Sequence, residues 1–320
     1  MNEDYLWDRS GEPDPEIAHL EEVLGELRWS KPPALRLPPA TERRRRPLLS
    51  MAAAAALLLA AGATLYVRTR HVAGPLTSWQ LSLAGARGNA VRSGQLIETG
   101  KAARGTMRSE FVAEVNLEPN SRLRLVAARE GLQQLALERG TIHAFIWAPP
   151  ATFVVDTPSA KTVDLGCRYT LTVAPDGGGF LSVDMGWVAF EWHGVESFIP
   201  AGAVCSTSRG HGPGTPYFKD APQALSKGIA EFDLNGNEEN LLAALAAARP
   251  KDALTLWHLL RRTEGRERGE VFDRFASVVK LPANVTRENV LRGDQSAADD
   301  AWNALQLGDM TWWRGWKRRW

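Results

Sequence analysis

The stretch FVVDTPSAKTVDLGCRYTLTV, residues 153–173, decides the fold class of this chain. It contains three short apolar or alternating runs, at 153–155, 160–163 and 169–173. Short runs of this kind, rich in Val, Thr and aromatic residues, are typical of β-strands. No helix of ordinary length fits between them, so a parallel sheet with helical crossovers is not expected. The stretch therefore predicts a region built from short strands.

The same pattern continues on both sides of this stretch, from about residue 91 to residue 206. Turn signals such as Arg139-Gly140, Pro149-Pro150, Pro175–Gly179 and His193-Gly194 recur between the runs. Many short strands, with turns about every eight to twelve residues, predict an all-β sandwich, barrel or solenoid. The other predicted strands are 111–115, 121–126, 134–137, 141–146, 180–183, 187–190 and 196–199.

Upstream of the β region, residues 48–67 (LLSMAAAAALLLAAGATLYV) contain no charged residue. As a helix they would extend about 30 Å, which matches the hydrocarbon core of a bilayer. Arg43–Arg46 precede the segment, and only Arg68 and Arg70 follow it closely. This bias predicts a single-pass protein of a bacterial inner membrane, with its N-terminus cytoplasmic and its C-terminus periplasmic. One alternative is a cleaved signal peptide, which would need an unusually long charged region before its apolar core. The other is an Ala-rich helix at Ala52–Ala61, buried in a soluble protein.

The first thirty residues are acidic and contain an amphipathic pattern. Asp14-Pro15 is a helix start, with Asp as the N-cap and Pro at the first helical position. So short a segment cannot bury much core alone. It is either a solvated acidic tail or a helix that docks in the groove of a basic cytoplasmic partner. The apolar stripe predicted to bind this partner consists of Ile17, Leu20, Val23, Leu24 and Leu27.

The chain has two cysteines, Cys167 and Cys205, and no Cys-x-x-Cys or Cys/His cluster. A structural zinc site of standard spacing is therefore not expected. If both cysteines lie outside the cytoplasm, a disulfide between them is one alternative. The other is two separate buried thiols, which behave as small apolar side chains.

After a Gly/Pro-rich linker at 210–216 the pattern becomes helical. The leucines of the segment 251–262 fall on mixed faces, which predicts a helix buried on more than one side. The tail at 312–320 carries four tryptophans among basic residues. It either contacts a membrane interface or packs back on the helices. The predicted helices are 240–248, 251–262, 266–279, 286–291 and 297–307.

No pattern in the sequence indicates an enzyme. It contains no nucleophile elbow, phosphate-binding loop or zinc-protease motif, and its six histidines are scattered. We therefore expect no catalytic residues, no cofactor and no metal. The net charge of +1 argues against a global electrostatic footprint for nucleic acid, so no direct nucleic-acid partner is expected.

Five motifs follow one another along the β region: LEPNSRLRL (117–125), LALERGTIHAFI (135–146), residues 153–173, GWVAFEW (186–192) and IPAGAVCSTS (199–208). Their order resembles the FecR family, named for the ferric-citrate regulator. The departure is Cys167, at a position where the family usually has Thr. The head segment YLWDRSGEPDPEIAHLEEVLGELR also looks like the opening helices of membrane-bound anti-sigma factors.

This resemblance implies a signal transducer with a solenoid-like or stacked-hairpin β domain outside the cytoplasm. It also implies a cytoplasmic head that binds an extracytoplasmic-function sigma factor, with an outer-membrane receptor or envelope ligand as the second partner. The rival hypotheses are a tethered envelope-binding scaffold without a sigma-factor partner and, least favoured, a membrane-anchored hydrolase. The predicted domains are the head (1–30), a Pro/Arg-rich linker (31–47), the membrane span (48–67), the FecR-like β domain (85–208) and an all-α region (220–320).

Overall fold

The computed structural model describes His19, residues 78–83 and residues 88–308. The chain divides into two compact units, Met1–Tyr66 and Val67–Trp320, and every strand and helix described below belongs to the second. The predicted head stripe, the linker and the membrane span at 48–67 lie outside the described residues. Within the described ranges, no helix is both long and apolar enough to cross a bilayer.

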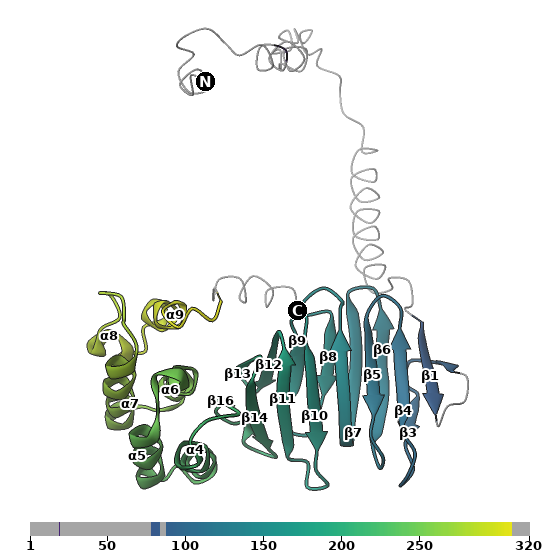
Figure 1. Cartoon of the computed structure of the whole chain (residues 1–320), viewed down its shortest axis with the longest axis horizontal. Coiled ribbons are helices and arrows are strands. Elements are labelled where there is room, and N and C mark those ends of the chain that lie inside the picture. The colour runs from purple at the N-terminus through teal and green to yellow at the C-terminus, as the bar shows by residue number, and fades with distance from the viewer. Residues whose placement is uncertain (1–18, 20–77, 84–87, 309–320) are drawn as a thin grey trace, which may run out of the picture. The chain divides into compact units, whose positions relative to one another are not determined.

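The β region predicted from the sequence is confirmed, and it begins earlier and ends later than residues 85–208 (Figure 1). Its strands start at Trp79 and continue to Phe218. The first eight are β1 (Trp79–Leu83), β2 (Asn89–Val91), β3 (Leu96–Glu98), β4 (Gly105–Ser109), β5 (Ala113–Leu117), β6 (Arg122–Arg129), β7 (Leu132–Ile146) and β8 (Phe153–Asp156). They are followed by β9 (Lys161–Asp164), β10 (Arg168–Val173), β11 (Gly179–Met185), β12 (Trp187–Trp192), β13 (Val195–Pro200), β14 (Ala203–Ser208), β15 (Gly212–Pro213) and β16 (Tyr217–Phe218).

The strands form two sheets that share the long strand β7. The first sheet has the order β2-β1-β4-β5-β7-β10-β11-β14, and β15 and β16 pair with β14. The second has the order β3-β6-β7-β8-β9-β12-β13. Neighbours are antiparallel except β7 and β8, which run parallel. From β8 onward, consecutive hairpins alternate between the two sheets.

Alternation of side chains explains why both sheets close over one core. In β5 and β10 every second side chain is buried, which is the period of a strand with one solvated face. Inward residues of both sheets belong to the same hydrophobic cluster. The first sheet supplies Val115, Ile142, Leu171 and Leu181, and the second supplies Leu123, Leu135, Val163 and Phe190.

Gly140 is the position at which β7 passes from the second sheet to the first. Residues 132–139 pair with β6, and residues 140–145 pair with β10. Gly140 has a φ of +96°, and a Cβ placed on it would lie 2.4 Å from the Cα of Ser121. Only glycine, which has no Cβ, tolerates both this backbone conformation and this close approach. The sequence had suggested a turn at Arg139-Gly140, whereas the strand continues through it.

The described chain enters the β domain at one end, which we call the entry end. It is formed by Ser78, the β4–β5 turn (110–112), the β6–β7 turn (130–131) and the β7–β8 connection (147–152). Backbone hydrogen bonds join these segments: Trp147 N donates to Val112 O at 3.0 Å, and Gln133 N donates to Thr152 O at 2.7 Å. The β10–β11 turn lies at the other end, because Arg168 pairs with Phe145 near the entry end while Val173 pairs with Gly140.

The helical C-terminal region is also confirmed, and it contains one helix that was not predicted. This is α4, whose Gly228 approaches the next helix closely enough that a Cβ would lie 2.7 Å from Asn240 O. The predicted burial of the segment 251–262 on several sides is confirmed, because residues 253–260 are all buried. The helices are α4 (Gln223–Asn235), α5 (Glu238–Ala247), α6 (Ala253–Arg262), α7 (Gly265–Val278), α8 (Arg287–Leu291) and α9 (Gln295–Asn303), with a 3₁₀ turn at Pro250–Asp252.

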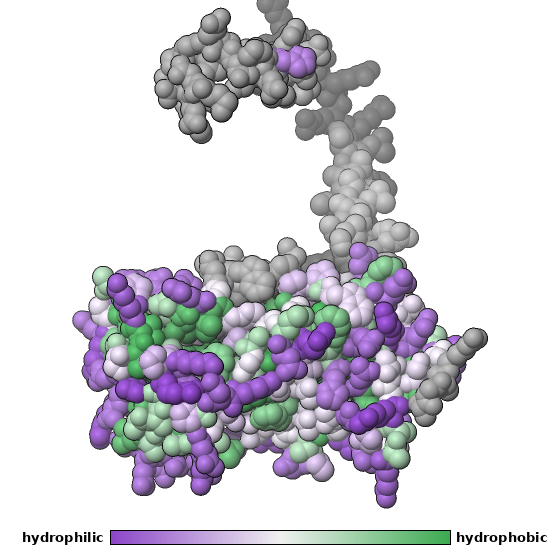
Figure 2. Space-filling model, in the orientation of Figure 1, coloured by the Kyte–Doolittle hydropathy of each residue, from purple (hydrophilic) through white to green (hydrophobic). Residues whose placement is uncertain are grey.

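The helices gather beside the part of the β domain that contains β12 to β14 and β16 (Figure 1). On the face shown in Figure 2, the surface over the strands is mainly hydrophilic or neutral, and apolar side chains are more prominent over the helices. The helices and strands belong to one continuous cluster of buried residues. The two regions therefore share a core.

Candidate functional site

Trp79 fixes the first strand to the interior of the β domain. Its side chain is fully buried, and its indole N–H donates to Gln133 Oε1 at 2.9 Å. The ring also packs on Phe153, with 6.2 Å between the ring centroids. A buried Trp that satisfies its N–H contributes both apolar area and a directional bond. The chain is thus held firmly at the entry end, twelve residues after Val67, the last residue of the predicted membrane span.

His258 of α6 joins the helices to the second sheet. Its Nδ1 donates to Leu254 O at 2.8 Å, and its Nε2 accepts from the backbone N–H of Phe198 on β13 at 3.0 Å. This pair of contacts fits the neutral imidazole with its proton on Nδ1. Burial lowers the pKa of His258 to about 3, so the ring stays neutral at physiological pH. It acts as a fixed link between the two regions.

Arg262, at the end of α6, makes a second polar link at the same junction. Its guanidinium donates to Pro213 O at 2.8 Å, to Ser197 Oγ at 2.6 Å and to Gly214 O at 3.0 Å. It also lies 3.9 Å from Asp233 of α4, whose carboxylate accepts two bonds from Thr215. One side chain therefore connects β13, the β14–β16 segment and two helices. Arginine suits this role because its planar donors form a fork.

An aromatic cluster fills the rest of the junction. The ring of Trp302 on α9 lies 4.7 Å from Trp257, 5.6 Å from Phe198 and 5.8 Å from Trp187. All but Trp187 are at most 4% exposed. These rings come from α9, α6, β13 and β12, so the last described helix packs directly on the β domain. Aromatic pairs at this spacing contribute beyond their buried area.

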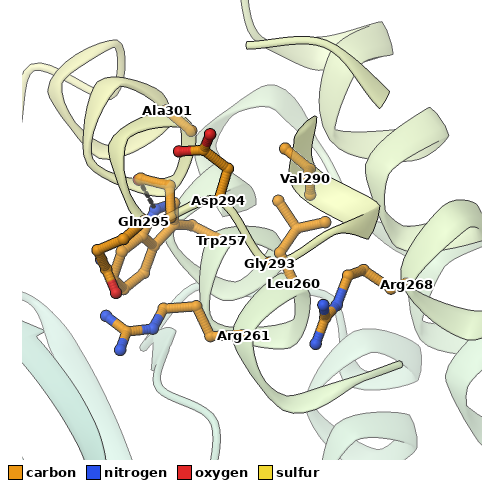
Figure 3. A pocket seen from close by; sticks show the side chains of 10 residues that line it. Trp257, Leu260, Arg261, Arg268, Val290, Gly293, Asp294, Gln295 and Ala301 are labelled. Atoms are coloured by element: carbon orange, nitrogen blue, oxygen red, sulfur yellow. Dashed lines mark hydrogen bonds between the residues drawn. The ribbon is translucent and has the colours of Figure 1, made fainter. Parts of the chain in front are cut away.

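A cavity of about 150 Å³ lies among helices α6 to α9 (Figure 3). Arg261 and Arg268 lie on one side of it and Asp294 on the other. Arg268 donates to Thr263 O at 2.6 Å, Asp294 caps α9 by accepting from Ala297 N, and Trp257 donates to Ala298 O. These polar groups hold the helices together, so we assign no ligand to this cavity.

The two cysteines are free and buried, so the alternative of two separate thiols describes the structure and the disulfide does not. Cys167 lies just before β10 and donates to Asp164 Oδ2. Cys205 lies on β14, opposite Leu181 of β11. Burial raises the pKa of Cys205 to about 12 and the pKa of Cys167 well above its ordinary value. Both thiols therefore stay protonated at neutral pH and are poor nucleophiles.

Asp164 is a carboxyl group inside the core, with only 1% of its surface exposed. Burial raises its pKa to about 7, although the Cys167 thiol and the Gly166 N–H, at 2.8 Å, favour its charged form. The hydroxyl of Tyr169 is buried nearby in the sequence without a hydrogen-bond partner in the described part of the chain. Asp164 is therefore a titratable group of the β domain whose pKa lies near neutral pH.

We expect the Asp164→Asn variant to lose the part of the pH dependence of stability between about pH 4 and pH 7 that Asp164 contributes. The pKa of Asp164 is higher in the folded than in the unfolded state. The stability that this group contributes is therefore complete below its unfolded pKa, and it is lost as the pH rises through its folded pKa. For a shift from 3.8 to about 7 the loss has an upper bound of roughly 4 kcal/mol. Urea unfolding at pH 4 and pH 8 measures it. Asn keeps the acceptor for Gly166, so an unchanged slope would show that Asp164 is not responsible.

Of the predicted site residues, the structure describes the two cysteines but not the head stripe. The head stripe Ile17, Leu20, Val23, Leu24 and Leu27 lies outside the described residues, so its predicted binding role stays a prediction. His19, which we did not assign to a site, is helical and exposed. The junction residues His258, Arg262 and Trp302 were not singled out from the sequence, and no local pattern marks them. Among the described residues, no group of three or more His, Cys, Asp or Glu side chains could hold a metal ion.

Comparison with known proteins gave partial structural matches. No family model and no curated protein sequence matches the chain. Two crystal structures of a protein from Parabacteroides distasonis, titled "putative anti-sigma factor", match it with 15% sequence identity and a TM-score of 0.35. Each match covers 43% of this chain, and 65% and 64% respectively of the matched chain, which is less than two thirds. This likeness is distant, and a TM-score this low carries no argument about function.

Proposed function

We propose that the chain is a FecR-like, membrane-spanning signal transducer that relays an extracytoplasmic signal to a cytoplasmic sigma factor. In this proposal it is a regulator rather than an enzyme, located in a bacterial inner membrane. Its partners are an extracytoplasmic-function sigma factor at the head and an outer-membrane receptor or envelope ligand at the β domain. The order of an acidic amphipathic head, an uncharged segment of membrane length and a large β domain supports it.

The observation that carries the proposal is the anchoring of Trp79. A transducer needs its extracytoplasmic domain to be coupled mechanically to the segment that crosses the membrane. The buried ring of Trp79 and its bond to Gln133 fix the start of β1 to the core, so a movement of the β domain is passed to the chain just upstream. The junction at Arg262 and His258 makes the helices move with the strands. A force on either region therefore reaches the same entry point.

We expect Leu24→Asp in the full-length chain to abolish co-purification with the sigma factor. A buried charge without a partner in an apolar helix–groove interface costs several kcal/mol, which corresponds to a loss of binding of at least about 100-fold. The measurement is a pull-down from solubilised membranes of cells that express the chain together with an extracytoplasmic-function sigma factor from the same bacterium.

The matched control is His19→Asp, which adds the same charge at an exposed helical position of the head. We expect this variant to retain the sigma factor. If wild type captures no sigma factor, or if both variants behave alike, the head is not a sigma-factor ligand and the scaffold hypothesis replaces the proposal. Extraction by alkaline carbonate tests the membrane span separately.

A further inference from the structure

A cleft of about 560 Å³ opens at the entry end of the β domain. Its lining comes from Ser78, both neighbouring turns and the β7–β8 connection. Val112, Ala148 and Pro149 give it an apolar wall, and Ser109, Glu110 and Glu130 bring polar groups to it. The cleft therefore combines an apolar surface with acceptors for hydrogen bonds.

Ser109 is the unusual residue of this lining. It is the last residue of β4, belongs to the inward-facing set of that strand and is 2% exposed. Its Oγ is buried and has no hydrogen-bond partner in the structure as far as it is described. An unsatisfied buried hydroxyl is unfavourable, so native proteins usually give such a group a partner. Because Ser109 lines the cleft, a rotation about χ1 would offer its hydroxyl to a bound molecule.

Two carboxylates stand at the turns that border the same cleft. Glu110 belongs to the β4–β5 turn and Glu130 to the β6–β7 turn, and both are exposed. Neither has an ion pair or hydrogen-bonded side-chain partner within the described ranges, whereas nearby Glu114 is paired with Arg108 at 3.2 Å. Between them in the lining is Phe111, which is 76% exposed. The two carboxylates therefore bring negative charge to the border of the cleft.

We propose that this cleft binds a primary ammonium group carried on an apolar stem. An ammonium group has three N–H donors, and the lining offers three acceptor side chains, those of Ser109, Glu110 and Glu130. Hydrogen bonds between ionised groups are stronger than neutral ones. The exposed ring of Phe111 adds a face to which cations are attracted, and the apolar wall holds the stem. A quaternary ammonium has no N–H and satisfies none of the acceptors.

The position of the cleft identifies a lipid headgroup as one source of this ammonium. Eleven residues separate Val67 from Ser78, so the cleft lies within about 40 Å of the end of the predicted span. Ethanolamine headgroups of the same bilayer carry a primary ammonium and an apolar body. This choice of source rests on the proposed function, whereas the recognition of an ammonium does not. A soluble amine is the other source.

The test is hydrogen–deuterium exchange of the full-length chain in nanodiscs, followed at the two turns, residues 108–113 and 129–134. In one arm the bilayer contains ethanolamine lipid or choline lipid with the same acyl chains. In the other, ethanolamine or choline is added to chain held in choline-lipid nanodiscs. We expect clear protection of both turns by ethanolamine lipid and by soluble ethanolamine. Choline, which is attracted to the carboxylates and to Phe111 but has no N–H to donate, should protect them less. Protection by the soluble amine alone would keep the ammonium site and reject the lipid as its source.

Variants make the test specific. The double variant Glu110→Gln, Glu130→Gln should weaken ethanolamine binding by at least about tenfold, because the neutral amides lose the charge attraction. The control Glu264→Gln removes an exposed carboxylate from the helical region and should change nothing. Thermal unfolding verifies that each variant is folded. Equal protection by choline, or no protection by either form of ethanolamine, would overturn the proposal. A chain that fails to enter nanodiscs overturns the membrane span instead, and soluble ethanolamine added to detergent-solubilised chain still tests the cleft.

Discussion

Replacing Gly140 with alanine is expected to destabilise the β domain by about 3–5 kcal/mol. Two costs add at this position. The φ of +96° is a conformation that L-residues with a side chain rarely adopt, and the new Cβ would lie 2.4 Å from the backbone of Ser121. Ser121 is fully buried and its hydroxyl both donates to Thr141 O and accepts from Thr141 N, so it cannot move aside cheaply. The measurement is urea unfolding followed by tryptophan fluorescence.

The control is Gly131→Ala, which separates the two costs. Gly131 also has a positive φ, +76°, but a Cβ placed on it meets nothing within 4 Å. Only the conformational penalty remains, so the expected loss is about 1 kcal/mol. If the two variants lost the same stability, the close approach to Ser121 would not be what requires glycine at 140.

The strands of the β region could be predicted because alternation is a local property. The segments 141–146 and 169–173 are strands in the structure, since each buries one face against the opposite sheet. The continuity of β7 through Gly140 could not be predicted, because the same glycine that signals a turn also permits a strand to cross between sheets. That choice depends on the contact with Ser121, nineteen residues earlier in the chain.

The junction between strands and helices shows the same limit more strongly. Arg262 and Ser197 are 65 residues apart, and His258 and Phe198 are 60 apart. Nothing in the local sequence of either partner indicates the other. Helix α4 was missed for a related reason: Gly228 weakens the local helical signal, yet it is required for the contact with α5. The head and the membrane span remain predictions from the sequence.

Arg262 also affects the protonation of Asp233, so its role at the junction is electrostatic as well as mechanical. Burial raises the pKa of Asp233, while Arg262 and the two bonds from Thr215 favour its charged form. Without the guanidinium, the carboxylate would keep its desolvation penalty and lose its nearest cation. The acceptors at Pro213 and Ser197 would lose this donor at the same time, and Gly214 O would keep only the Ser197 hydroxyl and the Cys205 thiol. Removal of one partner from such a buried network lowers the free energy of unfolding by far more than the ion pair itself contributes to it.

We therefore expect Arg262→Gln to destabilise the chain by about 3–5 kcal/mol at pH 7 and by less at pH 4. Because the pKa of Asp233 is higher in the folded than in the unfolded state, the stability that Asp233 contributes is complete below its unfolded pKa and is lost as the pH rises. The variant raises the folded-state pKa of Asp233 further, so more stability is lost at pH 7. Urea unfolding at the two pH values measures the difference, and hydrogen exchange should report the opening first in β13 and α6.

The exposed Arg266, which makes only surface ion pairs, provides the control: Arg266→Gln should lower the stability by less than about 1 kcal/mol. Equal effects of the two substitutions, or a loss at Arg262 that is the same at both pH values, would contradict the coupling to Asp233.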